Sequence, residues 1–221
     1  MPPAVTACQG LRRSTYAQTR IACEQAFRTY GLPRAIRTDN GEPFGSCGLG
    51  GLSRLALWWI KLGIIPERIQ PGRPQQNARH ERLHGTLKRG CGIRSNLAQQ
   101  QRAFDRYLQI YNNERCHQTL GRHQTPAMHY QSSPRPYPSR VPELTYPDGY
   151  LVKRVHPAGS IALCARYWYV AQILRGEWVG LNPIDDGIWY VFVGPVCVGR
   201  LNARNTRIEP INTLIDMPTL H

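Results

Sequence analysis

The sequence is short of acidic residues, of paired cysteines and of long apolar runs. Its 14 Asp and Glu residues face 28 Lys and Arg residues, for a formal net charge of +14 at pH 7. Such a surplus favours a polyanionic partner, and nucleic acid is the commonest one. Arginine greatly outnumbers lysine, which suits two-pronged contacts to phosphate. No apolar run approaches the roughly 18 residues of a membrane span, so we expect no membrane partner.

The cysteine pattern excludes the common zinc motifs. Seven cysteines stand at positions 8, 23, 47, 91, 116, 164 and 197, and no pair has the Cys-x-x-Cys spacing of such motifs. The odd number of cysteines, together with the lack of a signal peptide at the start of the sequence, indicates a reducing compartment. We therefore expect a cytoplasmic protein.

Two carboxylates stand in settings that suit a metal ion. Residues 34–37 predict a short strand leading to Asp39, and Asn40-Gly41 predicts a tight turn, because both residues tolerate positive φ. Glu81 stands on a helix predicted to begin near residues 76–77. Oxygen ligands for Mg²⁺ surrounded by cations are what phosphoryl transfer on nucleic acid requires. Taken singly, an Asp-Asn-Gly turn is more often only a turn, and a helical Glu among arginines more often forms surface pairs.

The helix around Glu81 carries a row of groups suited to DNA. Asn77, His84 and Lys88 share one face with Glu81, because they recur at helical spacing. The candidate DNA-binding residues are Arg73, Asn77, Arg79, Arg82, His84, Lys88 and Arg89. The alternative for Lys88 is a solvated surface residue. His80 directly precedes Glu81, which does not fit the His-Glu-x-x-His pattern of zinc proteases.

Three further helices and a set of strands are predicted. The helices cover residues 15–30, 52–62 and 97–114, where Gly31 ends the first and Asn96 caps the last. On the second, one apolar face is made by Leu52, Leu55, Ala56 and Trp59. Short strands between residues 150 and 198, separated by turns, predict a small SH3-like barrel. The predicted barrel is basic, because it carries arginines 154, 166, 175, 200, 204 and 207. The alternative for these arginines is an ordinary solvated surface without a DNA-binding role.

Several motifs resemble one known family. The succession Thr38-Asp39-Asn40-Gly41, Pro74-Gln75-Gln76-Asn77 and Glu81 resembles the core of DDE transposases and retroviral-type integrases, in particular insertion-sequence transposases. Residues 111–117 resemble the family's Tyr-Asn-x-x-Arg-Pro-His segment, with Cys116 in place of the proline. The resemblance covers most of the chain.

The resemblance implies a function, a metal and partners. Asp39 and Glu81 match the family's second and third catalytic carboxylates, so both would be catalytic residues and ligands of Mg²⁺ or Mn²⁺. The implied reaction is DNA integration, in which metal-dependent phosphoryl transfer cleaves DNA and joins strands. The implied partners are DNA, both transposon ends and target, and further copies of the chain in a homo-oligomer. The implied location is the bacterial cytoplasm, at the nucleoid.

The chain departs from the family at the first catalytic carboxylate. Glu24 is the only acidic residue before Asp39, and it lies in a stretch predicted to be helical. We find no candidates for the strand that carries the family's first Asp, or for the other opening strands of its sheet. We therefore expect an N-terminally truncated fragment that holds metal weakly and is catalytically inactive. The alternative is a non-catalytic DNA-binding or assembly module that acts through the barrel and the basic helices.

The predicted fold class is α/β, with a partial RNase H-like catalytic core followed by a small all-β SH3-like barrel. The RNase H-like part follows from the family resemblance, and the barrel follows from the strand pattern. The predicted domains are the partial core over residues 1–130, a Pro-rich linker over 131–148 and the barrel over 149–210.

A third alternative, a ribosome- or RNA-associated basic protein, fits the charge but leaves the two carboxylates unexplained.

Overall fold

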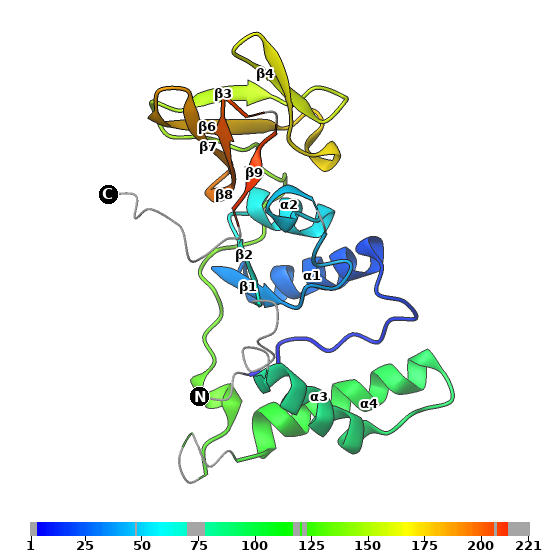
Figure 1. Ribbon diagram of the computed structural model, residues 1–221. Coiled ribbons are helices and arrows are strands. Elements are labelled where there is room, and N and C mark those ends of the chain that lie inside the picture. Colours follow the sequence, from blue (N-terminus) through cyan, green and yellow to red (C-terminus); the bar gives the residue numbers. More distant parts are fainter. Residues whose placement is uncertain are drawn as a thin grey trace. The chain divides into compact units, whose positions relative to one another are not determined.

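The structure is a computed structural model that describes residues 4–46, 48–69, 78–116, 120, 123–205 and 207–211, with only the backbone of residues 78–80 (Figure 1). The chain forms two compact units. The first unit comprises residues 1–33 and 70–137, and the second comprises residues 34–69 and 138–221. Each unit is therefore built from two separate stretches of sequence.

The first unit opens with helix α1 (Tyr16–Tyr30). Thr15 caps its N-terminus, since Oγ1 accepts a hydrogen bond of 3.4 Å from a backbone N–H in the first turn. Gly31 follows the helix with a φ of +79° and donates its N–H to the Phe27 carbonyl, as glycine commonly does at a helix end. A Cβ at Gly31 would lie 2.5 Å from the Ser133 carbonyl oxygen, so only glycine fits this close approach. The predicted helix over 15–30 is confirmed.

The other helices of the first unit are α3 (Ala78–Cys91), α4 (Leu97–Gln109), the π-helical turn η3 (Ile110–Glu114) and the short 3-10 helix η4 (Pro126–His129). Asn96 caps α4 as predicted, because its side chain accepts a hydrogen bond of 2.9 Å from the Gln99 backbone N–H. The predicted helix over 97–114 is thus found as α4 and η3 in succession.

The residues before α1 are held by two amide side chains of α4 and η3. Asn112 makes two hydrogen bonds with the Val5 backbone, at 2.9 and 2.8 Å. Gln101 accepts a bond of 2.9 Å from the Gly10 N–H and donates one of 3.0 Å to the Cys8 carbonyl. An amide offers both a donor and an acceptor, so it can pair with an extended backbone as a neighbouring strand would. No pattern in the sequence predicted this contact.

The second unit begins with two parallel strands, β1 (Ala35–Thr38) and β2 (Ile65–Arg68), which pair in register from Ala35–Ile65 to Thr38–Arg68. Between them lie η1 (Leu49–Gly51) and helix α2 (Arg54–Lys61). Ser53 caps α2, because its Oγ accepts a hydrogen bond of 3.1 Å from the Ala56 N–H. The predicted helix over 52–62 is therefore confirmed, with its start two residues later, directly after the capping serine.

The rest of the second unit is a β module over the described residues from 138 to 211. A five-stranded antiparallel sheet has the order β3-β6-β7-β8-β9, and β4 and β5 form a separate hairpin. The bounds are β3 Leu151–Arg154, β4 Ser160–Leu163, β5 Arg166–Tyr169, β6 Trp178–Asp185, β7 Ile188–Val193, β8 Val196–Asn202 and β9 Glu209–Pro210, with η5 at Gln172–Leu174. The strands predicted between residues 150 and 198 are present. An antiparallel sheet of this size is consistent with a barrel-like domain, while the SH3-like topology stays a prediction.

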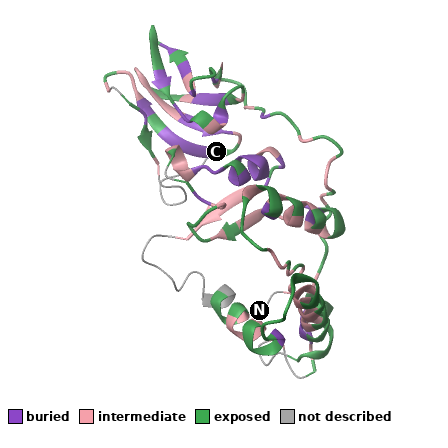
Figure 2. Ribbon diagram, turned by 90° about the vertical axis from the view of Figure 1, so that its right-hand side faces the viewer, coloured by how far each residue is buried: buried purple, intermediate pink, exposed green. Residues whose placement is uncertain are grey.

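Helix α2 and the β module share one hydrophobic core. The helix side contributes Leu52, Ala56, Leu57 and Ile60, and the β module contributes, among others, Val155, Ile161, Trp168, Val179, Leu181 and Val191. The close packing is also seen at Gly194, where a Cβ would lie 2.9 Å from Ile60 Cγ2. Lys61, at the end of α2, pairs with Glu177 at 2.8 Å. Buried residues accordingly gather in α2 and in the strands of the β module (Figure 2).

This shared core was not predicted from the sequence. The predicted division into residues 1–130, 131–148 and 149–210 follows the order of the chain, whereas the compact units group residues 34–69 with 138–221. The sequence-based domain boundaries stay a prediction. No helix in the described part of the chain is both long and apolar enough to cross a membrane.

Candidate nucleic-acid interface

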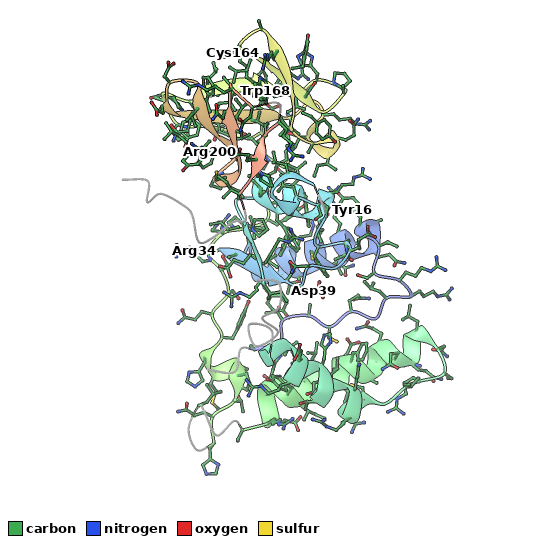
Figure 3. All side chains as sticks on the ribbon, viewed as in Figure 1. Tyr16, Arg34, Asp39, Cys164, Trp168 and Arg200 are labelled. Carbon is green, nitrogen blue, oxygen red and sulfur yellow. The ribbon has the colours of Figure 1, made fainter. Side chains whose placement is uncertain are left out.

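Asp39 lies where the sequence predicted it, directly after β1 (Figure 3). Its Oδ1 accepts a hydrogen bond of 3.1 Å from the Gly41 N–H, which closes the predicted turn. Asn40 ties the same turn to the end of β2, because its side-chain amide donates to the Ile69 carbonyl at 3.1 Å. The side chain of Asp39 is exposed. One of its two carboxylate oxygens is therefore used by the turn, and the turn leaves the other oxygen for a cation.

Glu81 lies in the first turn of α3 and is exposed. Lys88 and Arg89 lie in the last turn of the same helix. An acidic side chain at the start of a helix and basic ones at its end both interact favourably with the helix dipole. These positions therefore have a structural explanation as well as the functional one that the sequence indicated.

The two predicted metal ligands lie in different compact units. Asp39 belongs to the second unit and Glu81 to the first. Among the described residues, no group of three or more His, Cys, Asp and Glu side chains comes together in a way that could hold a metal ion. The predicted convergence of Asp39 and Glu81 stays a prediction.

Four of the predicted DNA-binding residues have described side chains, and all four lie on α3: Arg82, His84, Lys88 and Arg89. Arg79 lies on α3 with its side chain outside the described part, and Arg73 and Asn77 lie outside the described residues altogether. Cations spaced along one helix can follow the phosphates of a DNA strand. Their contact with DNA stays a prediction.

His84 has a second role available within the first unit. It lines a small cavity of about 80 Å³ together with Val5, Cys8, Leu83, Leu87 and Tyr107. The residues before α1, α3 and α4 all contribute to this cavity, so part of the His84 side chain serves packing. Burial, with Cys91 and Asp105 nearby, raises the pKa of Cys8 to about 11, which is the behaviour of a structural thiol. Among the described residues all six cysteines are free.

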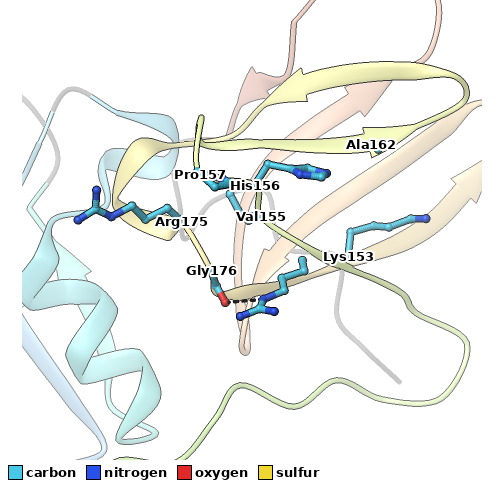
Figure 4. Close-up of a pocket in the computed structure, with 8 residues that line it drawn as sticks. Lys153, Val155, His156, Pro157, Ala162, Arg175 and Gly176 are labelled. Atoms are coloured by element: carbon cyan, nitrogen blue, oxygen red, sulfur yellow. Dashed lines mark hydrogen bonds between the residues drawn. The ribbon is translucent and has the colours of Figure 1, made fainter.

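One basic cavity of the second unit was not assigned from the sequence. It has a volume of about 740 Å³ and lies in the β module, lined by Lys153, Arg154, His156 and Arg175 among others (Figure 4). We call it the basic groove. The sequence identified Arg154 and Arg175 only as part of a basic barrel surface. The signal that would have added the other two is the run Lys153-Arg154-Val155-His156, in which three of four residues are cationic or can become so.

Part of the chain is similar to known proteins. Residues 62–126 match the family described as integrase core domain. Over 102 residues, 45% of the chain, the sequence is 32% identical to an uncharacterized 31.7 kDa protein of insertion element IS407 from Burkholderia multivorans. It is 34% identical over 102 residues to an uncharacterized 39.2 kDa protein of insertion element IS476 from Xanthomonas euvesicatoria. The chain spans about a third of these relatives, 35% and 28% of their lengths respectively.

One solved structure shows a weak overall similarity to this chain. It is a chain of the simian T-cell lymphotropic virus intasome in complex with PP2A regulatory subunit B56 gamma, with a TM-score of 0.44 and 15% identity over 90% of this chain and 66% of that chain. At this similarity no residue is assigned a role by the match. The family and insertion-element matches confirm the resemblance drawn from the motifs: residues 62–126 match the integrase core domain, and the sequence is similar to proteins of insertion elements.

Proposed function

We propose that this chain binds DNA as part of an integrase- or transposase-type system, and that the 221-residue polypeptide taken alone does not join DNA strands. The observation that carries the proposal is the integrase core match over residues 62–126, which contains α3 with Glu81 and its cations. A protein with this function works in the bacterial cytoplasm at the nucleoid, in contact with transposon ends and target DNA.

The binding part of the proposal is supported by charge. Arg82, Lys88 and Arg89 lie on α3, and the chain as a whole carries a formal net charge of +14. Cations that replace counterions on phosphates give an affinity that falls steeply as salt rises. The β module, with its proposed SH3-like topology, supplies a second basic surface. Two separate basic surfaces on two units suit simultaneous contacts to different parts of one DNA molecule, or assembly of several copies on it.

The inactive part of the proposal is supported by the donor set. Two-metal phosphoryl transfer holds both ions with several carboxylates, and the motifs of this polypeptide supply only Asp39 and Glu81. The resemblance implies a third carboxylate, for which the sequence has no candidate before Asp39. We therefore propose that Mg²⁺ or Mn²⁺ binds weakly here and that two carboxylates alone do not support strand joining.

The test is a pair of assays on the purified full chain. DNA binding is measured by fluorescence anisotropy with a labelled duplex at a series of salt concentrations, and strand joining is measured on the same duplex with Mg²⁺ or Mn²⁺. We expect the native chain to bind DNA in a salt-dependent way and to give no joined product. The Asp39→Asn variant should bind DNA with the affinity of the native chain. Arg82→Ala/Lys88→Ala/Arg89→Ala should bind more weakly and show a shallower salt dependence, because three cations are lost. Joined product that disappears in Asp39→Asn would refute the inactive part, and no binding at low salt would refute the whole proposal.

A further inference from the structure

We propose that the basic groove of the β module, together with the tyrosines beside it, is a binding site for unpaired DNA. The inference rests on the proposed function, because it specifies which form of DNA the second unit recognises. The candidate DNA-binding residues between positions 73 and 89 all lie in the first unit, so the groove is separate from them; the sequence indicated only that the barrel surface as a whole is basic. It is built from β3, the segment after it, the hairpin β4–β5 and the turn at residues 175–176.

The charge of the groove suits phosphates. Lys153, Arg154, His156 and Arg175 line it, with Pro157 and Ala162 between them. Among the described residues that line it there is no carboxylate. The nearby Glu177 is engaged with Lys61 at 2.8 and 2.9 Å, so its charge is compensated. An anion in the groove therefore meets cations without an opposing acid.

The cations are spread out instead of converging on one point. In Figure 4 the side chains of Lys153 and His156 extend to one side of the groove, and that of Arg175 extends to the other. A small-molecule site usually brings a few polar groups together around one ligand. Charges placed at intervals fit a chain of repeated phosphates better. The arrangement therefore favours an extended polyanion over a compact one.

Arg154 is held in place by its neighbours. Its Nε donates a hydrogen bond of 3.3 Å to the Gly176 carbonyl, and its guanidinium carbon lies 5.9 Å from the centre of the Trp178 ring. The Nε bond uses only one of the five N–H donors of the guanidinium. A fixed guanidinium loses little side-chain entropy when a phosphate binds to its other nitrogens. Arg154 is thus the best-prepared phosphate contact in the groove.

Aromatic rings beside the groove distinguish it from a simple basic patch. In β5 the ring of Trp168 is buried, with 2% of its surface exposed, while Tyr167 and Tyr169 are 72% and 63% exposed. Tyr167 packs edge-on against His156 with the ring centres 5.4 Å apart, and its partner across the hairpin is Ala162. Both His156 and Ala162 line the groove, so the Tyr167 ring stands at its border.

The hairpin presents these two rings in a fixed way. The Tyr169 hydroxyl accepts a hydrogen bond of 3.3 Å from the Gln172 N–H. Cys164 and Ala165 form the hairpin turn with φ of +50° and +56°, the left-handed geometry that tight hairpins favour. Large exposed aromatic rings are costly in water, and the alternation along β5 places both on the same face. Rings held in the open beside cations are the features with which proteins stack unpaired bases.

Unpaired DNA is favoured over duplex by this combination. A duplex can offer its phosphates to the cations, but its bases are already stacked on each other. A single strand offers both phosphates and free base faces, so it can use Lys153 and Arg154 together with Tyr167. Nucleic-acid strands at the ends of cut or frayed DNA have this form. An acidic peptide would use the cations alone and gain nothing from the rings.

The test compares single-stranded and duplex DNA on the full-length chain. Fluorescence anisotropy is measured with a labelled oligonucleotide of about 12 nucleotides, within the range of about 4–16 that OB folds which bind single strands cover, and with its blunt duplex. We expect Tyr167→Ala to lower single-strand affinity about tenfold, and Tyr167→Phe to retain it because the ring is kept. Duplex affinity should change by less than about twofold in both, since paired bases do not use the ring. Circular dichroism confirms the fold, which these exposed positions should not disturb.

Charge variants and a competitor complete the test. Arg175→Ala should weaken single-strand binding more than Arg204→Ala, its matched control outside the groove. Polyglutamate of equal charge should compete poorly; equal competition would show a general polyanion site and overturn the inference. Unchanged single-strand affinity in Tyr167→Ala would overturn it as well, even if duplex binding is normal. If the native chain binds neither form of DNA at low salt, the proposed function itself fails.

Discussion

The two units of this chain differ in how completely they bury their apolar side chains. The second unit has an extensive apolar core shared by α2 and the β module, with side chains such as Trp168, Val179 and Leu181 almost completely buried. The first unit is made of helices whose burial is thin: α4 contains no buried residue, and Ile110, just after it, is exposed. Since burial of apolar area is the main source of stability, we infer that the second unit holds most of the fold's stability, while much of the integrase core match lies in the first.

Removal of buried side-chain volume should destabilise the second unit more than the first. Ile60→Ala opens a cavity where α2 meets the β module and should lower the free energy of unfolding of the second unit by about 2–5 kcal/mol. Leu108→Ala, in the half-buried face of α4, should lower the free energy of unfolding of the first unit by a smaller amount. Urea unfolding followed by tryptophan fluorescence reports on the second unit, because all five tryptophans, at positions 58, 59, 168, 178 and 189, lie there. Far-UV circular dichroism at the helix band, recorded in the same titration, reports on the helical first unit. A larger loss in Leu108→Ala would reverse the comparison.

The stability of the second unit should also depend on pH. Tyr146 donates its hydroxyl proton to the Trp178 carbonyl at 2.6 Å, and burial raises the pKa of Tyr146 to about 12. An unfolded tyrosine loses its proton near the ordinary tyrosine pKa of 10.0. Between these two pH values the unfolded state is deprotonated and the folded state is not, so stability falls as pH rises from about 10 to about 12.

The measurement is the midpoint of urea unfolding at about pH 9, about 10.5 and about 11.5, which brackets the window set by those pKa values. Tyr146→Phe is the control, because it keeps the ring and removes the titrating group. The variant should be less stable at about pH 9 and should lose less stability than the native chain between about pH 10 and about pH 12. Parallel loss in both proteins would show that other groups control the alkaline transition.

A smaller effect is expected from the ion pair that joins α2 to the β module. The Lys61 and Glu177 side chains are 20% and 25% exposed, so solvent screens the pair only in part. We expect a coupling free energy of about 1 kcal/mol, between the values for exposed and for buried pairs. A double-mutant cycle with Lys61→Met and Glu177→Gln measures it. A coupling near zero would mean that the shared core alone joins helix and β module.

Local structure was predictable from the sequence because its causes are local. The end of α1 at Gly31, the Asn96 cap and the turn after Asp39 each depend on residues that are neighbours along the chain. The same holds for the short strands of the β module. For each of these the sequence contains the residue whose backbone preference or side-chain acceptor forms the feature.

The packing of α2 was predicted only in part. One apolar face was assigned, with Leu55 and Trp59, yet Leu57, Trp58 and Ile60 are buried as well. A helix that is apolar on all sides indicates burial on all sides, and this signal was available in the sequence. The partner that buries it was not, because the β module lies far along the chain from α2 and nothing local indicates that contact.

The candidate site was likewise predictable only where it depends on neighbouring residues. The setting of Asp39 and the helical position of Glu81 followed from motifs. Their convergence on a metal depends on the arrangement of separate units and stays a prediction. The basic groove was missed because Lys153 and Arg175 come together only through strand pairing and the turn at residue 176. A charge pattern alone does not show which face of a sheet each side chain occupies.

Metal binding by Asp39 and Glu81 distinguishes an enzyme from a DNA-binding module. Mn²⁺ titrated into the full-length chain can be followed by electron paramagnetic resonance, with Asp39→Asn and Glu81→Gln measured in parallel. We expect only weak binding, with no saturable site that depends on both carboxylates. A tight stoichiometric Mn²⁺ site that is lost in each of the two variants would contradict it, and would show that Asp39 and Glu81 together complete a metal centre.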